Sequence, residues 1–175
     1  MQKFIRIIII LALIAIGIWI WRILFPNPEK MIRSQLDKLA TSVSFPSNQG
    51  VFAKSSYPQK LADFFTTNVE ITVNGPGREQ HSLNGRENLV QTATEVRWGL
   101  RGLDVKFVDI NVVLAPDRQS ATANLTAEVK ASSDQSLDAQ ELKFTFQKAG
   151  RKWLIRRVET VKTFTQRDAR ASARA

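Results

Sequence analysis

The chain has 175 residues, of which 43% are hydrophobic, and it carries a formal net charge of +9. This length suits one domain of ordinary size with an appendage and excludes two large domains. The chain contains no cysteine, which excludes disulfides, thiolate zinc sites, cysteine nucleophiles and a lipoprotein anchor on cysteine. The positive charge favours anionic partners such as phospholipid headgroups, nucleic acid or acidic proteins, without choosing among them.

The first segment is an apolar run over residues 4–25. A helix of this length matches the ~30 Å hydrocarbon core of a bilayer. Trp19 and Trp21 stand where an aromatic belt meets the membrane interface, beside Arg22. A cleaved signal peptide, the alternative, ends in small residues of the A-x-A kind, which this run lacks. The sequence therefore predicts that residues 1–27 form a retained transmembrane anchor.

Basic residues flank both ends of the apolar run, so the positive-inside rule alone does not fix its orientation. A short basic head before an N-terminal apolar run is typical of a signal-anchor, which favours the head inside the cell. We therefore expect a single-pass membrane protein, in a bacterial inner membrane, with its C-terminal domain in the periplasm.

Helical patterns follow the predicted anchor. Residues 28–43 carry apolar side chains at helical spacing, which predicts an amphipathic helix. Residues 44–58 are rich in Ser, Pro and Gly and indicate a loop, and residues 57–65 indicate a second, short helix. A third helix is predicted to begin at Asn84, which can form a capping box with Glu87. Its expected buried stripe consists of Leu89, Val90, Ala93 and Val96.

Alternation with a period of two predicts the strands. Residues 69–73 form a short strand before a turn at 74–77, and longer strands are expected at about 103–115, 119–131, 138–148 and 152–164. Within two of these strands one face is apolar, so one face of the sheet packs and the other meets water or a partner. Those apolar residues are Ala121, Ala123, Leu125, Ala127 and Val129, then Leu142, Phe144 and Phe146.

The order helix, helix, strand, helix and then long hairpin strands resembles the nuclear transport factor 2-like (SnoaL-like, cystatin-like) superfamily. The segments that carry the resemblance are "LADFFTTNVEITVNG", "LNGRENLVQTATEV" and "GRKWLI" from Gly150 to Ile155, where a Gly turn precedes a Trp as in the family's closing strand. The resemblance implies an α+β domain over residues 28–164, in which a strongly bent, mostly antiparallel sheet wraps around helices as a cone. In that family the cone holds a ligand or is filled by side chains, and its outer sheet face often forms dimers. A tethered version also resembles, in layout, the single-span envelope assembly proteins of type IV secretion and similar complexes.

Catalytic members of that family use acid and base groups that face the cone, and this chain offers few candidates. His81 is the only histidine and Tyr57 the only tyrosine, while Asp63 is near a catalytic position of relatives. The alternatives are a surface or capping role for His81, a packing role for Tyr57 and a solvated position on a helix for Asp63. Asp109 alternates with Phe107, so we expect the two on one face; if that face is concave, it places a carboxylate inside the cone.

Metal and nucleotide sites are not expected. One His and no Cys cannot build the usual zinc sites, and "GPGREQ" lacks the Lys and the downstream hydroxyl of a P-loop. We therefore expect no metal and no cofactor.

Basic residues gather on the last predicted strand and in the tail, residues 165–175, which has almost no apolar side chain and is expected to be disordered. One interpretation is a solvated strand face with a solubilising end. The other is contact with an acidic partner or with anionic headgroups, which attract each basic residue near the surface by ~1 kcal/mol. Nucleic acid is not expected, because no stacking aromatics are interleaved with the charges. The residues are Arg151, Lys152, Arg156, Arg157, Arg167, Arg170 and Arg174.

These patterns predict a membrane-anchored, non-enzymatic interaction or assembly subunit of a membrane or cell-envelope complex, with protein partners or a homodimer through the sheet face. The alternative is a small-molecule binding protein, or a lyase or isomerase, that uses the cone. An accessible apolar cavity with an inward carboxylate would favour the alternative. A cone filled by aromatic side chains would favour the interaction subunit; the expected ones are Phe64, Phe107, Phe144, Phe146 and Trp153.

Overall fold

The computed structural model describes residues 14, 16–17, 27–47, 57–74, 80–132 and 137–164. In chain order, the elements of the domain are α2 (Pro28–Val43), α4 (Tyr57–Ala62), β1 (Phe65–Asn74), β2 (Gln80–Asn84), α5 (Arg86–Gly99), β3 (Leu103–Leu114), β4 (Ser120–Ala131), β5 (Leu137–Ala149) and β6 (Lys152–Phe164). The predicted α+β class is confirmed, and α2 has the bounds that the sequence predicts.

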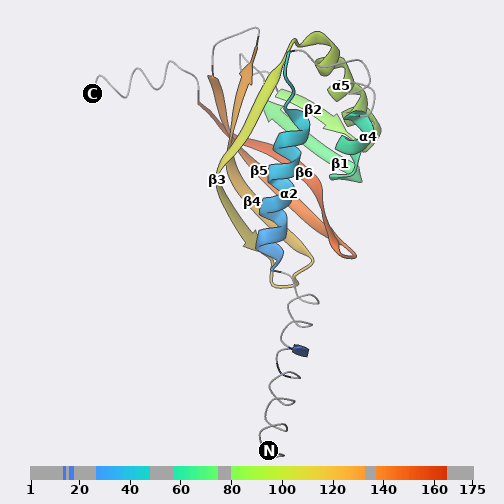
Figure 1. Ribbon diagram of the computed structural model, residues 1–175, viewed down its shortest axis with the longest axis vertical. Coiled ribbons are helices and arrows are strands. Elements are labelled where there is room, and N and C mark those ends of the chain that lie inside the picture. The colour runs from blue at the N-terminus through green and yellow to red at the C-terminus, as the bar shows by residue number, and fades with distance from the viewer. Residues whose placement is uncertain are drawn as a thin grey trace, which may run out of the picture.

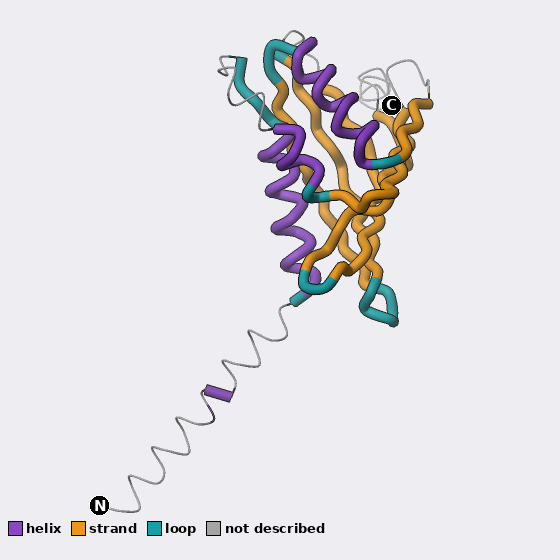
Figure 2. The backbone as a smooth tube through the Cα atoms, turned by 90° about the vertical axis from the view of Figure 1, so that its right-hand side faces the viewer, coloured by secondary structure: helices purple, strands orange, loops and turns teal. Residues whose placement is uncertain are grey.

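The strands form one curved, mixed, six-stranded sheet in the order β2-β1-β6-β5-β4-β3. Neighbouring strands are antiparallel except β1 and β6, which are parallel. Figures 1 and 2 show α2 lying against the sheet, with α4 and α5 near the β1–β2 end. The sheet is thus mostly antiparallel, as expected, and β6, the last of the described strands, lies between β1 and β5.

The core lies between the helices and the concave face of the sheet. Ala121 and Ala123 of β4 stand opposite Phe146 and Phe144 of β5 in the ladder, so small and large side chains alternate across the face. All four are buried. The cluster also contains Ile32, Leu36 and Leu39 of α2, Leu125 and Ala127 of β4, and Trp153, Ile155 and Val158 of β6. The predicted apolar faces of the helix and of the two strands are therefore confirmed.

The segment before α5 differs from the prediction. Residues 80–84 form β2, which pairs antiparallel with β1, instead of leading directly into a helix. Asn84 is held in the ladder opposite Glu70, and Gly85, with φ of 86°, is the N-cap without any side-chain cap bond. The predicted capping box of Asn84 and Glu87 is therefore wrong, because strand pairing fixes Asn84 in an extended conformation.

Two further predictions about the helices are wrong. The short helix ends at Ala62, and Phe65 begins β1, where it pairs with Ile155 of β6. Sheet pairing here overrides the helical spacing of the sequence. On α5, Val96 is 46% exposed and the next residue, Arg97, is only 5% exposed, so the buried stripe is rotated at its C-terminal end.

A β-bulge in β3 changes which side chains face the core. Asp109 and Ile110 stand opposite Leu125 alone, and Asp109 has φ of 53°. The alternation shifts by one residue at this point, so that Phe107 packs against the core before the bulge and Ile110 after it. The prediction that Asp109 shares a face with Phe107 is wrong, because the extra residue turns Asp109 to solvent.

The predicted anchor and tail fall almost wholly outside the described residues. Ile14, Ile16 and Gly17 are helical. Trp19, Trp21 and Arg22, and the tail with Arg167, Arg170 and Arg174, lie outside. Among the residues described, no helix is long and apolar enough to cross a membrane.

Candidate functional site

A cavity of about 280 Å³ lies between the helices and the concave face of the sheet. We call it the interior cavity. Its walls include the aromatic rings of Phe45, Phe65, Phe107 and Phe144, with aliphatic side chains from α2, α4 and α5 between them. Arg97 of α5 is the one charged residue in this lining. The cavity is therefore shaped for a compact apolar group beside a single cation.

Arg97 is held at the cavity wall by an aromatic contact. Its Cζ atom lies 4.5 Å from the centroid of the Phe45 ring, which is a cation–π geometry. Phe45 is fixed in turn by two backbone hydrogen bonds with Leu103, at 2.7 Å and 2.9 Å. A guanidinium in an apolar wall costs free energy unless its charge is compensated, and the ring face supplies part of that compensation.

Proton-transfer groups are absent from the described lining of the interior cavity, which contains no Asp, Glu, His, Lys or Tyr. His81 is exposed on β2, Asp63 is exposed in the turn after α4, and Asp109 is exposed at the bulge. Tyr57 begins α4, and its side chain lies outside the described part of the structure. The structure therefore places the three described candidates, His81, Asp63 and Asp109, on different elements and outside the lining of the interior cavity.

The aromatic residues expected to fill the cone all belong to the core. Phe144, Phe146 and Trp153 are buried, and Phe64 and Phe107 pack against them. Phe144 stacks on Phe146 with ring centroids 6.3 Å apart and meets the edge of Phe107 at 5.7 Å. Only Phe107 and Phe144 of this set also line the interior cavity. Side chains of this set therefore pack in the core beside the interior cavity.

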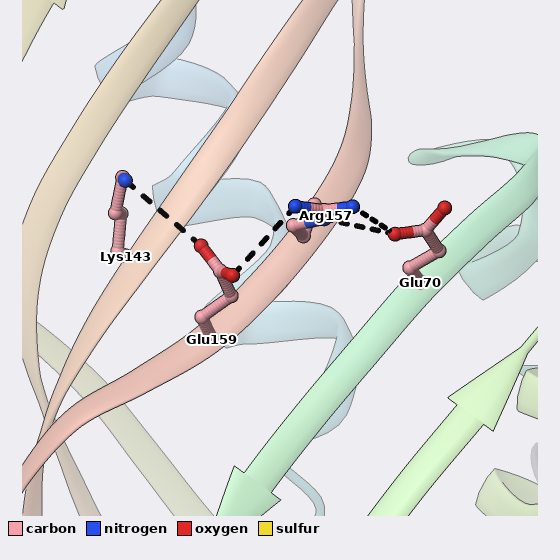
Figure 3. A network of polar contacts seen from close by, with 4 residues as sticks. All are labelled: Glu70, Lys143, Arg157 and Glu159. Atoms are coloured by element: carbon pink, nitrogen blue, oxygen red, sulfur yellow. Dashed lines mark hydrogen bonds and ion pairs between the residues drawn. The ribbon is translucent and has the colours of Figure 1, made fainter.

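The solvent-facing side of the sheet carries an ionic network across β5, β6 and β1 (Figure 3). Arg157 Nε donates to Glu70 Oε2 at 2.9 Å, and Arg157 Nη1 lies 3.8 Å from Glu159 Oε1. Lys143 Nζ lies 3.9 Å from the other oxygen of Glu159. Arg157 therefore lies between two carboxylates. The sequence had predicted it as a contact for anionic surfaces.

The same side of the sheet has a hollow of about 450 Å³ that crosses β3 to β6. Asp109, Asn111, Asn124 and Val161 are among its lining residues. Val113 of β3 and Val161 of β6 are 56% and 62% exposed. Apolar side chains thus remain open to a partner on this face.

The predicted anion-contact residues are spread over different parts of the molecule. Arg151 lies in the β5–β6 turn and Lys152 begins β6, while Arg156 is exposed farther along the strand. Arg151 and Lys152 line a groove of about 600 Å³ together with Lys30 and Lys38 of α2. In the described part of the chain, no group of three or more His, Asp and Glu side chains could hold a metal ion.

The buried Arg97 and the groove lysines of α2 were not predicted from the sequence. The helical spacing pointed to Val96, and the contact that buries Arg97 comes from Phe45, far away in the chain. Lys30 and Lys38 are eight positions apart on one helix. Because eight residues make slightly more than two turns, this spacing was the signal that could have placed the two lysines near one face.

No protein-family profile and no curated protein matches the sequence. Solved structures do match. Yeast Bre5, a Ubp3-associated protein, matches with a TM-score of 0.61 at 14% identity, over 81% of this chain and 100% of that one. A nuclear transport factor 2-like protein with a cystatin-like fold from Novosphingobium aromaticivorans has a TM-score of 0.60 at 17% identity, over 81% and 86%. A candidate scytalone dehydratase from the same organism has a TM-score of 0.55 at 15% identity, over 78% and 83%.

Identities this low bear on the fold alone. Two of the matching structures, with TM-scores of 0.60, are described as having a cystatin-like fold, and they align with the sheet and helices of Figure 1. The described domain of this chain therefore has the nuclear transport factor 2-like, cystatin-like fold that its sequence resembles.

Proposed function

We propose that this chain is a membrane-anchored, non-enzymatic interaction or assembly subunit. The observation that carries the proposal is the interior of the domain: buried aliphatic and aromatic side chains pack in it, and the described lining of the cavity beside them has no proton-transfer group. General acid–base catalysis needs such a group within hydrogen-bond reach of its substrate. A binding role needs only the surfaces that the fold presents.

The membrane part of the proposal is supported by the composition of residues 4–25. Two of its described residues, Ile14 and Ile16, are helical and 53% and 51% exposed, as expected for side chains that contact lipid. We propose a single span in a bacterial inner membrane, with the domain on the periplasmic side.

The partner surface that we propose is the solvent-facing side of the sheet. It combines the exposed Val113 and Val161 with a hollow and a charged network. The yeast protein Bre5, whose fold is similar, has been solved in a cofactor complex with the deubiquitinase Ubp3. That complex supports a protein-interaction role for the fold, with either a second copy or another subunit as the partner here.

The test is the native size of the full chain, extracted from its own membranes in mild detergent, with co-purifying chains identified by mass spectrometry. We expect a dimer or a larger assembly with stoichiometric partners. The double variant Val113→Glu/Val161→Glu should dissociate it, and Asn88→Glu, an exposed position on α5, is the control. A bare monomer, or equal dissociation by both variants, would contradict the proposal.

Small-molecule binding is a second candidate function, favoured by the position of Arg97 in a mostly apolar lining. Such a cavity suits a short apolar chain that ends in an anion. Thermal stabilisation by hexanoate should exceed that by hexanol, and Arg97→Met should remove the difference. Equal responses to hexanoate and hexanol would argue against this candidate.

A further inference from the structure

We infer that the end of the domain nearest the proposed anchor holds the headgroup of an anionic phospholipid. The site is the groove of about 600 Å³ between the part of α2 that runs to Lys38, the turn after α4 and the β5–β6 turn. We call it the basic groove. This inference rests on the membrane anchoring proposed above, and it names the lipid that the anchored domain would contact.

The charge of the basic groove is strongly one-sided. Lys30, Lys38, Arg151 and Lys152 line it and are exposed, and Asp63 is the one carboxylate among its described lining residues. None of the four cations forms an ion pair within the described part of the chain. Their charges therefore remain for a ligand, in contrast to that of Arg157.

Apolar residues line the groove together with the cations. Met31, Phe64 and Leu154 are partly buried, and Trp153 is 2% exposed. A groove that combines apolar side chains with cations fits an amphiphile that carries both a phosphate and hydrocarbon. A small soluble anion would make no use of the apolar side chains.

The position of the groove also favours a lipid. Asn27 lines the groove and follows closely after the apolar run. Its Oδ1 caps α2 by accepting a hydrogen bond of 3.0 Å from the backbone N–H of Glu29. Figure 1 shows the start of α2 at the same end of the domain as the β5–β6 turn. Arg118 and Lys148 are exposed at the turns of this end as well. A bilayer that receives the anchor would therefore face a cationic surface with the groove in it.

The absence of cysteine from the chain allows a clean probe of the groove. Ser34 lines the groove and is exposed, so Ser34→Cys accepts a bimane label with little change of structure. The labelled full chain is placed in nanodiscs of phosphatidylcholine alone or of equal parts phosphatidylcholine and phosphatidylglycerol. We expect quenching of the label by acrylamide, a neutral quencher, to fall by about half when phosphatidylglycerol is present.

Double variants at the two ends of the domain distinguish an effect of the groove from an effect of the net charge. Lys30→Gln/Lys152→Gln should abolish the protection by phosphatidylglycerol. Lys106→Gln/Lys130→Gln removes the same number of charges near the opposite end of the sheet, and should leave the protection intact.

Four results would overturn the inference, and they lead to three different conclusions. Equal quenching in both kinds of nanodisc, or equal loss in both double variants, would exclude the groove as a lipid site while leaving the anchor in place. Protection by soluble glycerol phosphate in phosphatidylcholine nanodiscs would replace the lipid by a free phosphate ester. Release of the unmodified chain from its own membranes by alkaline carbonate would overturn the anchoring itself, and the lipid with it.

Discussion

Arg157 Nε on β6 donates to Glu70 Oε2 on β1 at 2.9 Å, and so links the two strands of the parallel pair (Figure 3). The hydrogen bond and the charge of Glu70 raise the pKa of Arg157, with a smaller contribution from Glu159. Both side chains of the pair are about half exposed, at 48% and 42%. Water and salt therefore screen much of this interaction.

We predict a small loss of stability for Glu70→Gln, and a smaller one at high salt, since the pair is exposed. Over the neutral and mildly alkaline range, which lies below the ordinary pKa of arginine, a raised pKa of Arg157 leaves the contribution fully present, and it is lost only as the pH rises through that raised pKa. The difference between wild type and variant should therefore not change between neutral and mildly alkaline pH. Thermal unfolding of the full chain in detergent at two salt concentrations measures this, with Glu95→Gln on α5 as the control.

Phe146→Ala should lower the free energy of unfolding by about 3–5 kcal/mol, because Phe146 is 0% exposed and stacks on Phe144. Val161→Ala, at a position that is 62% exposed, should change it by no more than about 0.5 kcal/mol. Urea unfolding followed by circular dichroism gives both values. Similar values for the two variants would mean that the concave face is not the core.

Gly102→Ala should destabilise the domain by about 1 kcal/mol, because a Cβ there would collide with Ser132 Oγ and lie 3.1 Å from Ser47 Oγ. Ser132→Gly should restore part of the loss, since it removes the colliding side chain and keeps the hydrogen bond from the Ser132 amide to the Gly102 carbonyl at 3.0 Å. A double-mutant cycle measures the coupling. Additive effects of the two substitutions would show that the contact is not close.

Asp109→Gly should raise stability by up to about 1 kcal/mol, and Asp109→Val should lower it by about 1–2 kcal/mol, because the φ of 53° suits glycine and strains a β-branched residue. Asp104, on the same strand, has no positive φ and is the matched control. At Asp104 the valine variant should be more stable than the glycine variant, since valine favours strands and glycine weakens them. The same order at both positions would contradict the bulge.

The long, regular elements of this fold were predictable because each carries its own periodicity. The helix over residues 28–43 and the strand over 152–164 have the predicted bounds. Strand β2 was missed, since its sequence, "QHSLN", has almost no apolar alternation and it becomes a strand only by pairing with β1. The bulge at Asp109 was missed because it depends on the register with β4, which a single strand does not contain.

The candidate sites were less predictable than the fold. Arg97 directly follows Val96, the last residue of the predicted helical stripe, and it packs on the ring of Phe45, which a bridge to Leu103 fixes in place. The basic groove joins Lys30 to Lys152 across most of the length of the chain. The sequence identified Arg151 and Lys152 as a basic pair, but the cations that complete the groove follow only from the packing of α2 beside β6.

The parallel pairing of β1 with β6 sets the order in which the domain can be built. Glu70 and Arg157, which join the pair, are 87 positions apart, and β6 is the last strand described. Until β6 is synthesised, β5 lacks one neighbour and the β1–β2 hairpin is separate from the rest of the sheet. The two parts of the sheet, β1–β2 and β3–β5, can therefore join only after the last described strand has been synthesised.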